Sequence, residues 1–156
     1  MAVVHATSAG TERYRQRFAG TIPEEHFRAR DGCMLSSIGL GTYLGDPDDA
    51  TDDAYQQAIV AAVRSGCNVL DTAINYRHQR SERAIARAIR CLQDEHAILR
   101  EELFVSTKGG YVPFDGDYPD EFLERYPDLA GDVTRAGTSA ESHRPSEGVR
   151  EPQLRK

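Results

Sequence analysis

The sequence predicts an α/β fold with a parallel sheet, on three observations. Short apolar runs, typical of buried strands, alternate with two segments whose apolar residues recur at helical spacing. A two-residue turn signal nearer the N-terminus indicates a β-hairpin. The predicted order is therefore hairpin, β, α, β, α, β, and the connections suit right-handed parallel crossovers.

The region before the parallel sheet is expected to hold an extension and the hairpin. Residues 1–26 are polar and are interpreted as an N-terminal extension, with a short helix over residues 12–18. Residues 27–38 alternate around Asp31 and Gly32, which predicts two paired strands. The second strand is expected to run on through residues 37–42.

The first long helix is predicted over residues 54–65. Tyr55, Ile59 and Val63 fall on one face, and Gly66 stands where a helix commonly ends. The acidic run before it, residues 46–53, lacks the glycine and glutamate of a calcium-binding loop, so a solvated loop and helix start are expected.

Two buried-type strands flank the second helix. They are predicted at residues 68–71 and 103–107. The helix between them is expected to open at Ser81 as its N-cap, with Glu82 in the first turn. Its apolar positions keep the i, i+3, i+4, i+7 spacing of a buried face: Ile85, Ala88, Ile89 and Leu92.

Beyond residue 110 the composition changes. The folded unit is expected to cover residues 27–112, and residues 113–156 are expected to be irregular or disordered, with one helical turn near residues 121–125. From residue 131 the chain is almost wholly small, polar, charged or proline and has no period of 2 or 3.6, so disorder is predicted there.

Composition limits the classes of partner and compartment. A net charge of -6 argues against nucleic acid or an anionic membrane as the main partner. Cys33, Cys67 and Cys91 are odd in number and widely spaced, so neither a disulfide framework nor a metal site is predicted. With no membrane-length apolar run and no secretion signal, a cytoplasmic location is expected.

An acid, a phenol and an amine follow the ends of neighbouring strands. Asp71 and Lys108 end successive strands, and Tyr76 lies in the loop after Asp71. The carboxyl ends of parallel strands form the reactive edge of such sheets. A neighbouring ammonium favours the ionised form of a phenol, and an acid would hold that ammonium charged. Tyr76 could then exchange a proton with a carbonyl oxygen as hydride is transferred.

These motifs together resemble the N-terminal part of an aldo-keto reductase. The residues that carry the resemblance are Gly39-Leu40-Gly41-Thr42, Asp71-Thr72-Ala73 with Tyr76, Ser81-Glu82 and Ser106-Thr107-Lys108, after a hairpin like that of the barrel floor. The resemblance implies a partial (β/α)8 TIM barrel with a hairpin and about three βα units.

By the same resemblance, Asp71, Tyr76 and Lys108 are catalytic, and Gly41, Thr42, Tyr43 and Asp71 contact the cofactor. It also implies NADPH or NADH as cofactor and a small-molecule carbonyl substrate. The family's fourth catalytic residue, a histidine that ends the next strand, has no counterpart; the later His143 stands in no strand pattern.

Other interpretations of these motifs are weaker. The glycines at 39, 41 and 45 are spaced G-x-G-x-x-x-G, which is not the dinucleotide fingerprint. A short-chain dehydrogenase would place a lysine four residues after Tyr76, where Arg80 stands. His78 and Arg80 are close enough to Tyr76 to touch a substrate, but loop residues of this kind are usually solvated, and that is the expectation here.

The length of 156 residues is short of the roughly 250 of a complete (β/α)8 barrel. We therefore expect a truncated member of the family. The alternative is a non-catalytic partial barrel that assembles through its open sheet edge, with itself or with a complementary piece.

Overall fold

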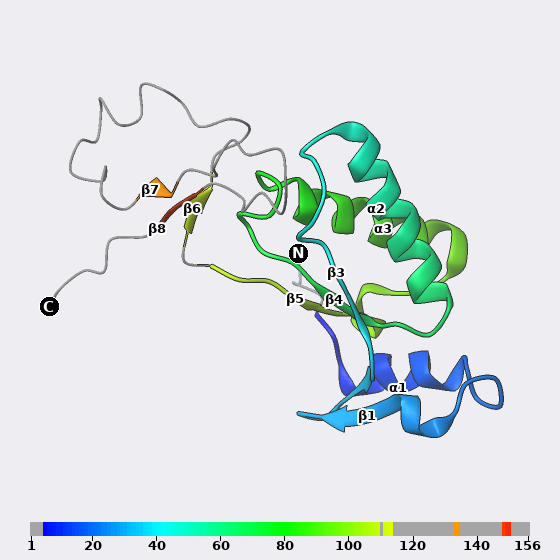
Figure 1. Cartoon of the computed structure of the whole chain (residues 1–156). Helices are drawn as coiled ribbons and strands as arrows, with labels where there is room; N and C mark the ends of the chain where they lie inside the picture. The colour runs from blue at the N-terminus through cyan, green and yellow to red at the C-terminus, as the bar shows by residue number, and fades with distance from the viewer. Residues whose placement is uncertain (1–4, 110, 114–132, 135–147, 151–156) are drawn as a thin grey trace, which may run out of the picture.

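The computed structural model describes residues 5–109, 111–113, 133–134 and 148–150. It shows a mixed α/β fold (Figure 1). Its elements, in chain order, are α1 (Ser8–Gln16), η1 (Glu24–His26), β1 (Phe27–Arg30), β2 (Cys33–Ser36), β3 (Gly39–Gly41), α2 (Asp49–Arg64), β4 (Val69–Asp71), α3 (Arg80–His96), η2 (Arg100–Glu102), β5 (Phe104–Ser106), β6 (Tyr111–Pro113), β7 (Val133–Thr134) and β8 (Gly148–Arg150).

A three-stranded parallel sheet in the order β3-β4-β5 carries the fold. The crossover helices α2 and α3 lie side by side over one face of it (Figure 1). In register, Leu40, Leu70 and Val105 stand on adjacent strands and belong to the core or pack against it. Successive side chains alternate between faces, so Gly41, Asp71 and Ser106 point to the other face.

The hairpin forms as predicted, with Phe27 opposite Ser36 and the turn at Asp31 and Gly32, both at positive φ. The expected continuous strand through residues 37–42 is wrong, because β2 ends at Ser36 and β3 joins the parallel sheet instead.

Asn68 fastens the hairpin to the parallel sheet. This side chain is fully buried. Its Oδ1 accepts a hydrogen bond from the Ser36 amide at 2.8 Å, and its Nδ2 donates to the carbonyls of Met34 at 2.9 Å and Glu102 at 3.3 Å. A buried amide is stable only when such partners are present. One side chain therefore fixes β2 and η2 against the start of β4.

The helix starts differ from the predicted ones. α1 begins at Ser8, where the Thr7 hydroxyl accepts from the Gly10 amide at 2.9 Å, so the prediction of residues 12–18 is four residues late. α2 begins at Asp49, because the Asp48 carboxylate accepts from the Thr51 amide at 2.7 Å. In both cases the capping side chain, and not the apolar periodicity, decides where the helix begins.

α3 also starts earlier than predicted. It begins at Arg80, and the residue before it, Gln79, has a left-handed backbone with no side-chain cap. Ser81 is therefore not the N-cap. It is fully buried in the first turn, and its hydroxyl donates to the Thr42 carbonyl at 2.6 Å. The serine ties α3 to the end of β3.

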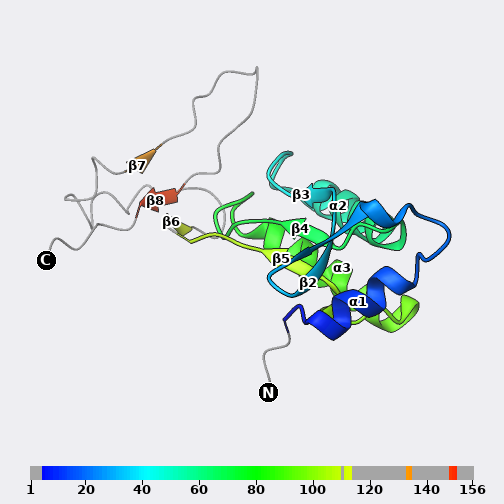
Figure 2. The same ribbon diagram turned by 90° about the horizontal axis from the view of Figure 1, so that it is seen from below.

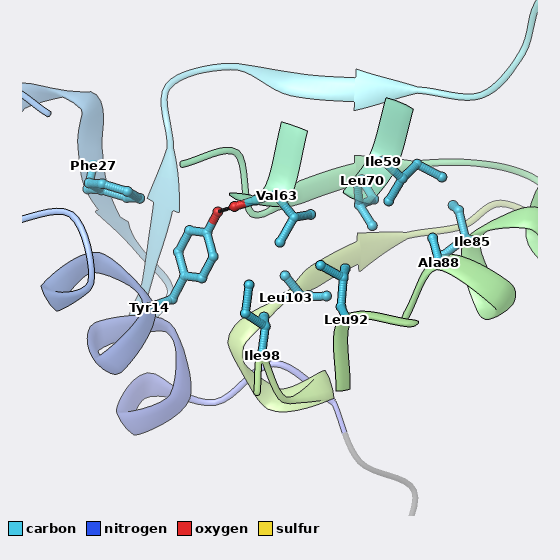
Figure 3. Packing of buried hydrophobic residues seen from close by; sticks show 10 residues of the cluster. All are labelled: Tyr14, Phe27, Ile59, Val63, Leu70, Ile85, Ala88, Leu92, Ile98 and Leu103. Carbon is cyan, nitrogen blue, oxygen red and sulfur yellow. Dashed lines mark hydrogen bonds between the residues drawn. The ribbon is translucent and has the colours of Figure 1, made fainter. Parts of the chain in front are cut away.

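The core joins the helices, the parallel sheet and the segment before the hairpin (Figure 3). Its buried hydrophobic cluster consists of Tyr14, Phe27, Ile59, Val63, Leu70, Ile85, Ala88, Leu92, Ile98 and Leu103. Tyr14 reaches into this cluster from α1, and its hydroxyl donates to the Val63 carbonyl. The region before residue 26 therefore contributes to the same core as the βα units.

Ion pairs reinforce the contact between α1 and η2. Glu102 is fully buried, and its carboxylate accepts from Arg13 Nε at 2.6 Å and from Arg17 Nε at 3.1 Å. Figure 2 shows α1 beside β2, below the parallel sheet. A buried carboxylate needs such partners, so these arginines account for the placement of Glu102.

Three short strands after residue 110 form a third sheet, which is antiparallel, in the order β6-β8-β7. Disorder was predicted from residue 131, and it is wrong for β7 and β8. Val149 pairs with both Val112 and Val133, and β-branched residues favour strands even in a polar stretch. The predicted turn at 121–125 and the rest of the predicted disorder lie outside the described residues.

Among the helices that the structure describes, none is both long and apolar enough to cross a membrane.

Candidate active site

Asp71, Tyr76 and Lys108 meet at the carboxyl edge of the parallel sheet. Lys108 Nζ donates to both carboxylate oxygens of Asp71, at 2.7 and 2.8 Å, and to the Tyr76 hydroxyl at 3.2 Å. It also donates to the Thr72 carbonyl at 2.9 Å. The Lys108 ammonium therefore holds the Asp71 carboxylate and the Tyr76 phenol close together.

Strand pairing explains why these residues meet. Asp71 ends β4 opposite Ser106 of β5. Pairing continues past the strands, because the Thr72 amide donates to the Ser106 carbonyl at 2.8 Å and the Ile74 amide donates to the Lys108 carbonyl at 3.4 Å. The backbone thus carries Lys108 alongside the loop that leads to Tyr76.

The electrostatics favour a charged lysine. Partial burial works against the ammonium, but hydrogen bonds to Asp71 and Tyr76 outweigh it, so the pKa of Lys108 is raised. The side chains of Lys108 and Asp71 remain 46% and 44% exposed. The Lys108–Asp71 pair is therefore accessible to water and to a bound molecule.

Tyr43 and Tyr76 lie against each other at this edge. Their ring centroids are 4.9 Å apart with the rings inclined by 67°, an edge-to-face contact. Lys108 Nζ lies 4.8 Å from the centroid of the Tyr76 ring. The loop after β3 therefore contributes one wall beside the phenol.

Gly41 and Thr42, the other predicted cofactor contacts, differ in what they offer. A Cβ built on Gly41 would meet no atom within 4 Å, so the backbone there borders open space. Thr42 is fully buried, and its hydroxyl donates to the Asp71 carbonyl at 3.1 Å. Gly41 thus leaves the backbone open opposite Asp71, whereas Thr42 aligns β3 with β4.

Sequence reasoning missed Arg77, the residue after Tyr76. Its side chain is buried, and its guanidinium donates to the Asp52 carboxylate at 2.6 Å and to the Asp46 carbonyl at 2.8 and 3.0 Å. The signal was present as an excess of arginines, 77, 80 and 87, opposite the acidic run at 46–53.

The expectation that residues 46–53 and Arg80 are simply solvated is wrong at two positions. Asp52 is only 7% exposed, and Arg80 pairs with both Asp49 and Asp52, the latter at 2.8 Å. The Asp52 carboxylate thus balances the charges of Arg77 in the next βα loop and of Arg80 at the start of α3.

One group of residues in the described part of the chain has metal-ligand chemistry. The ligand atoms of Cys91, Glu95 and His96, near the end of α3, all lie within 4.8 Å of one another. Burial, followed by the charge of Glu95, raises the pKa of Cys91.

Comparison with known proteins identifies the family of this chain. The sequence model of the Aldo/keto reductase family matches residues 37–141, more than half of the chain. The chain belongs to the aldo/keto reductase family.

Several curated relatives are similar to it. An aldo-keto reductase of Mycobacterium tuberculosis is 40% identical over 88 residues, which are 56% of this chain and 24% of the relative. The 2,5-diketo-D-gluconic acid reductase B of a Corynebacterium species is 37% identical over 78 residues, 50% of this chain and 24% of that protein. The chain thus spans about a quarter of the length of the relatives it matches.

Two solved structures also match. A thermostable aldo-keto reductase in complex with the inhibitor epalrestat is 26% identical, with a TM-score of 0.43 over 52% of this chain and 30% of that one. An aldo-keto reductase from Klebsiella pneumoniae in complex with NADPH is 30% identical, with a TM-score of 0.36 over 51% of this chain and 25% of that one.

Proposed function

We propose that this chain is part of an NAD(P)H-dependent oxidoreductase that reduces an aldehyde or ketone to an alcohol. The observation that carries the proposal is the single ammonium of Lys108, which contacts both Asp71 and Tyr76. Family membership supports the oxidoreductase class. The three βα strands and the preceding hairpin would then be the first part of a (β/α)8 barrel.

In this proposal Tyr76 is the general acid. Its phenol donates a proton to the carbonyl oxygen of the substrate, and takes one back from the alcohol in the reverse direction. Lys108 stabilises the phenolate left after the transfer, because the ammonium lies 3.2 Å from the phenol oxygen. Asp71 keeps the ammonium charged and oriented through two hydrogen bonds.

The cofactor would be NADPH or NADH, which supplies a hydride to the carbonyl carbon. Gly41 and the exposed carboxylate of Asp71 leave room for the nicotinamide, and Tyr43 offers a half-buried ring beside it. In this assignment Thr42 acts indirectly, by fixing β3 against Asp71.

The proposal is tested with the full chain by NADPH fluorescence titration, followed by a carbonyl-reduction assay on the wild type and Tyr76→Phe. Tyr76→Phe removes only the phenol oxygen, so NADPH binding should persist while turnover is lost. Lys108→Met should lower turnover as well, since the neutral side chain cannot stabilise a phenolate. Equal turnover in the wild type and Tyr76→Phe would disprove the assigned role.

A second function is favoured by the open edges of the parallel sheet. In the described residues β5 pairs only with β4, and its Phe104 is 36% exposed. Ile38 and Leu44, which flank β3 at the other edge, are 65% and 52% exposed. Exposed edges with apolar residues favour pairing with another chain.

We therefore propose, as the alternative, a non-catalytic partial barrel that assembles through these edges with itself or with a complementary piece. Size-exclusion chromatography with light scattering tests it. The alternative predicts a dimer or larger assembly that Phe104→Lys weakens. A well-folded monomer at all concentrations would exclude obligate self-assembly.

A further inference from the structure

The loop that follows Tyr76 has an unfavourable backbone. Arg77, His78 and Gln79 have φ angles of 50°, 53° and 68°, so three successive non-glycine residues are left-handed. Side chains with a Cβ rarely adopt this conformation even singly. Such a backbone persists only where the surrounding structure holds it, and it is common at functional sites.

The contacts of the Arg77 side chain hold this backbone in place. Its side chain is 2% exposed, although it lies in a connecting loop. The guanidinium donates to the Asp46 carbonyl through Nε and Nη2, at 3.0 and 2.8 Å, and to the Asp48 carbonyl at 3.3 Å. It also pairs with the Asp52 carboxylate at 2.6 Å. All these acceptors belong to the loop after β3 or to the first turn of α2.

Arg77 therefore joins the two loops that carry the aromatic residues of the site. Tyr43 stands at the start of the loop after β3, and Tyr76 immediately precedes Arg77. The guanidinium carbon also lies 5.1 Å from the centroid of the Tyr55 ring, and the Tyr55 hydroxyl donates to the Leu44 carbonyl at 2.7 Å. The edge-to-face contact of Tyr43 with Tyr76 depends on both loops keeping their places.

We propose that Arg77 is a positioning residue, which fixes the phenol of Tyr76 against Lys108 by fastening the loop after β4 to the loop after β3. The effect of Arg77 on catalysis rests on the proposed role of Tyr76 as the general acid. Its effect on the position of the Tyr76 ring can be measured independently of turnover.

The geometry requires an arginine. A guanidinium is planar and presents several donors in a fixed fork, so it can serve two carbonyls and a carboxylate together. A lysine at this position would keep the charge opposite Asp52 but lose the fork. Arg77→Lys should therefore loosen the loop but keep the ion pair with Asp52. Arg77→Met should loosen the loop and also remove the ion pair.

The test uses fluorine NMR of the full chain labelled with 3-fluorotyrosine. The signals of Tyr76 and Tyr14 are assigned with Tyr76→Phe and Tyr14→Phe, and Tyr14 then reports the core. Lys108→Met is combined with each Arg77 variant, because the Tyr76 signal responds to Lys108 only while the two side chains are in contact. Arg90→Met, at an exposed arginine of α3, is the matched control.

In the wild type and in Arg90→Met, we expect Lys108→Met to shift the Tyr76 signal. In Arg77→Met, the Tyr76 signal should move toward that of free fluorotyrosine by more than its linewidth and lose its response to Lys108→Met, while the Tyr14 signal stays in place. If Arg77→Met unfolds the core, Arg77→Lys decides by the same criteria. An unchanged Tyr76 signal that still responds to Lys108→Met overturns the proposal.

These outcomes separate the inference from the proposed function. If Tyr76→Phe keeps its turnover while the fluorine signals behave as expected, the role of Tyr76 as the acid fails and the positioning by Arg77 stands. If Tyr76→Phe loses turnover while the Tyr76 signal is unchanged in the deciding Arg77 variant, the function stands and the positioning role fails.

Discussion

Replacing Tyr14 tests whether the segment before the hairpin belongs to the folded unit. Tyr14 lies on α1, is fully buried, and packs with its ring centroid 5.2 Å from that of Phe18 and 6.1 Å from that of Phe27. Its hydroxyl reaches the Val63 carbonyl on α2. Tyr14→Ala removes both the ring and the hydrogen bond, whereas Tyr14→Phe removes the hydrogen bond alone.

The two variants should differ clearly in their free energy of unfolding. Truncating a buried aromatic side chain to alanine costs about 3–5 kcal/mol, because the lost burial is added to the cost of a cavity. Losing one neutral hydrogen bond costs about 1 kcal/mol. The smaller figure suits Tyr14→Phe, because the Val63 carbonyl also accepts from the Gly66 amide at 3.2 Å. Against a total of about 5–15 kcal/mol for a domain, Tyr14→Ala would remove a large fraction.

Urea unfolding followed by far-UV circular dichroism measures these differences, and the chain has no tryptophan to serve as a probe. Both variants should unfold in one transition together with α2 and α3. If Tyr14→Ala lowered the free energy of unfolding by less than about 1 kcal/mol, Tyr14 would not be part of the core and α1 would be an independent appendage.

Three further outcomes follow from the packing around α1. Gly10→Ala should destabilise the fold by about 1–3 kcal/mol in urea unfolding, because a Cβ would overlap the Glu101 carbonyl; helix propensity alone predicts a gain, so a stabilised variant would contradict the contact. Burial raises the pKa of Tyr14, so near pH 10 the unfolded chain loses the phenol proton while the folded chain keeps it. The free energy of unfolding should therefore fall above about pH 10, and it should fall less in Tyr14→Phe. Glu102→Gln should cost about 1–3 kcal/mol by thermal unfolding, because its amide nitrogen would face an arginine donor such as Arg13; an unchanged melting temperature would refute this.

The order of the elements could be predicted because each depends on a local pattern. The Asp31-Gly32 turn, the apolar face around Ile59 and Val63, and the strand ending at Asp71 can each be identified within a short window. The helix starts were less accurate, because a capping residue such as Asp48 is one polar residue among several. The strands at Val133 and Gly148 were missed because they depend on pairing with each other.

Part of the candidate site could likewise be predicted from the sequence, and part could not. Asp71, Tyr76 and Lys108 could be placed together from strand order alone, since neighbouring parallel strands bring their carboxyl ends to one edge. Arg77 could not, because an arginine in a loop is usually solvated and its burial depends on carbonyls that stand some thirty residues earlier. Catalytic roles for these residues remain predictions.

The buried amide of Asn68 also bears on how the chain folds. Its partners, Ser36, Met34 and Glu102, each stand 32 to 34 residues away, one group before it and one after. While only one of these segments is in place, part of the amide is shut away from water without a partner, which is costly. Partly assembled states are therefore penalised, and the hairpin and the βα units should form in a single cooperative transition.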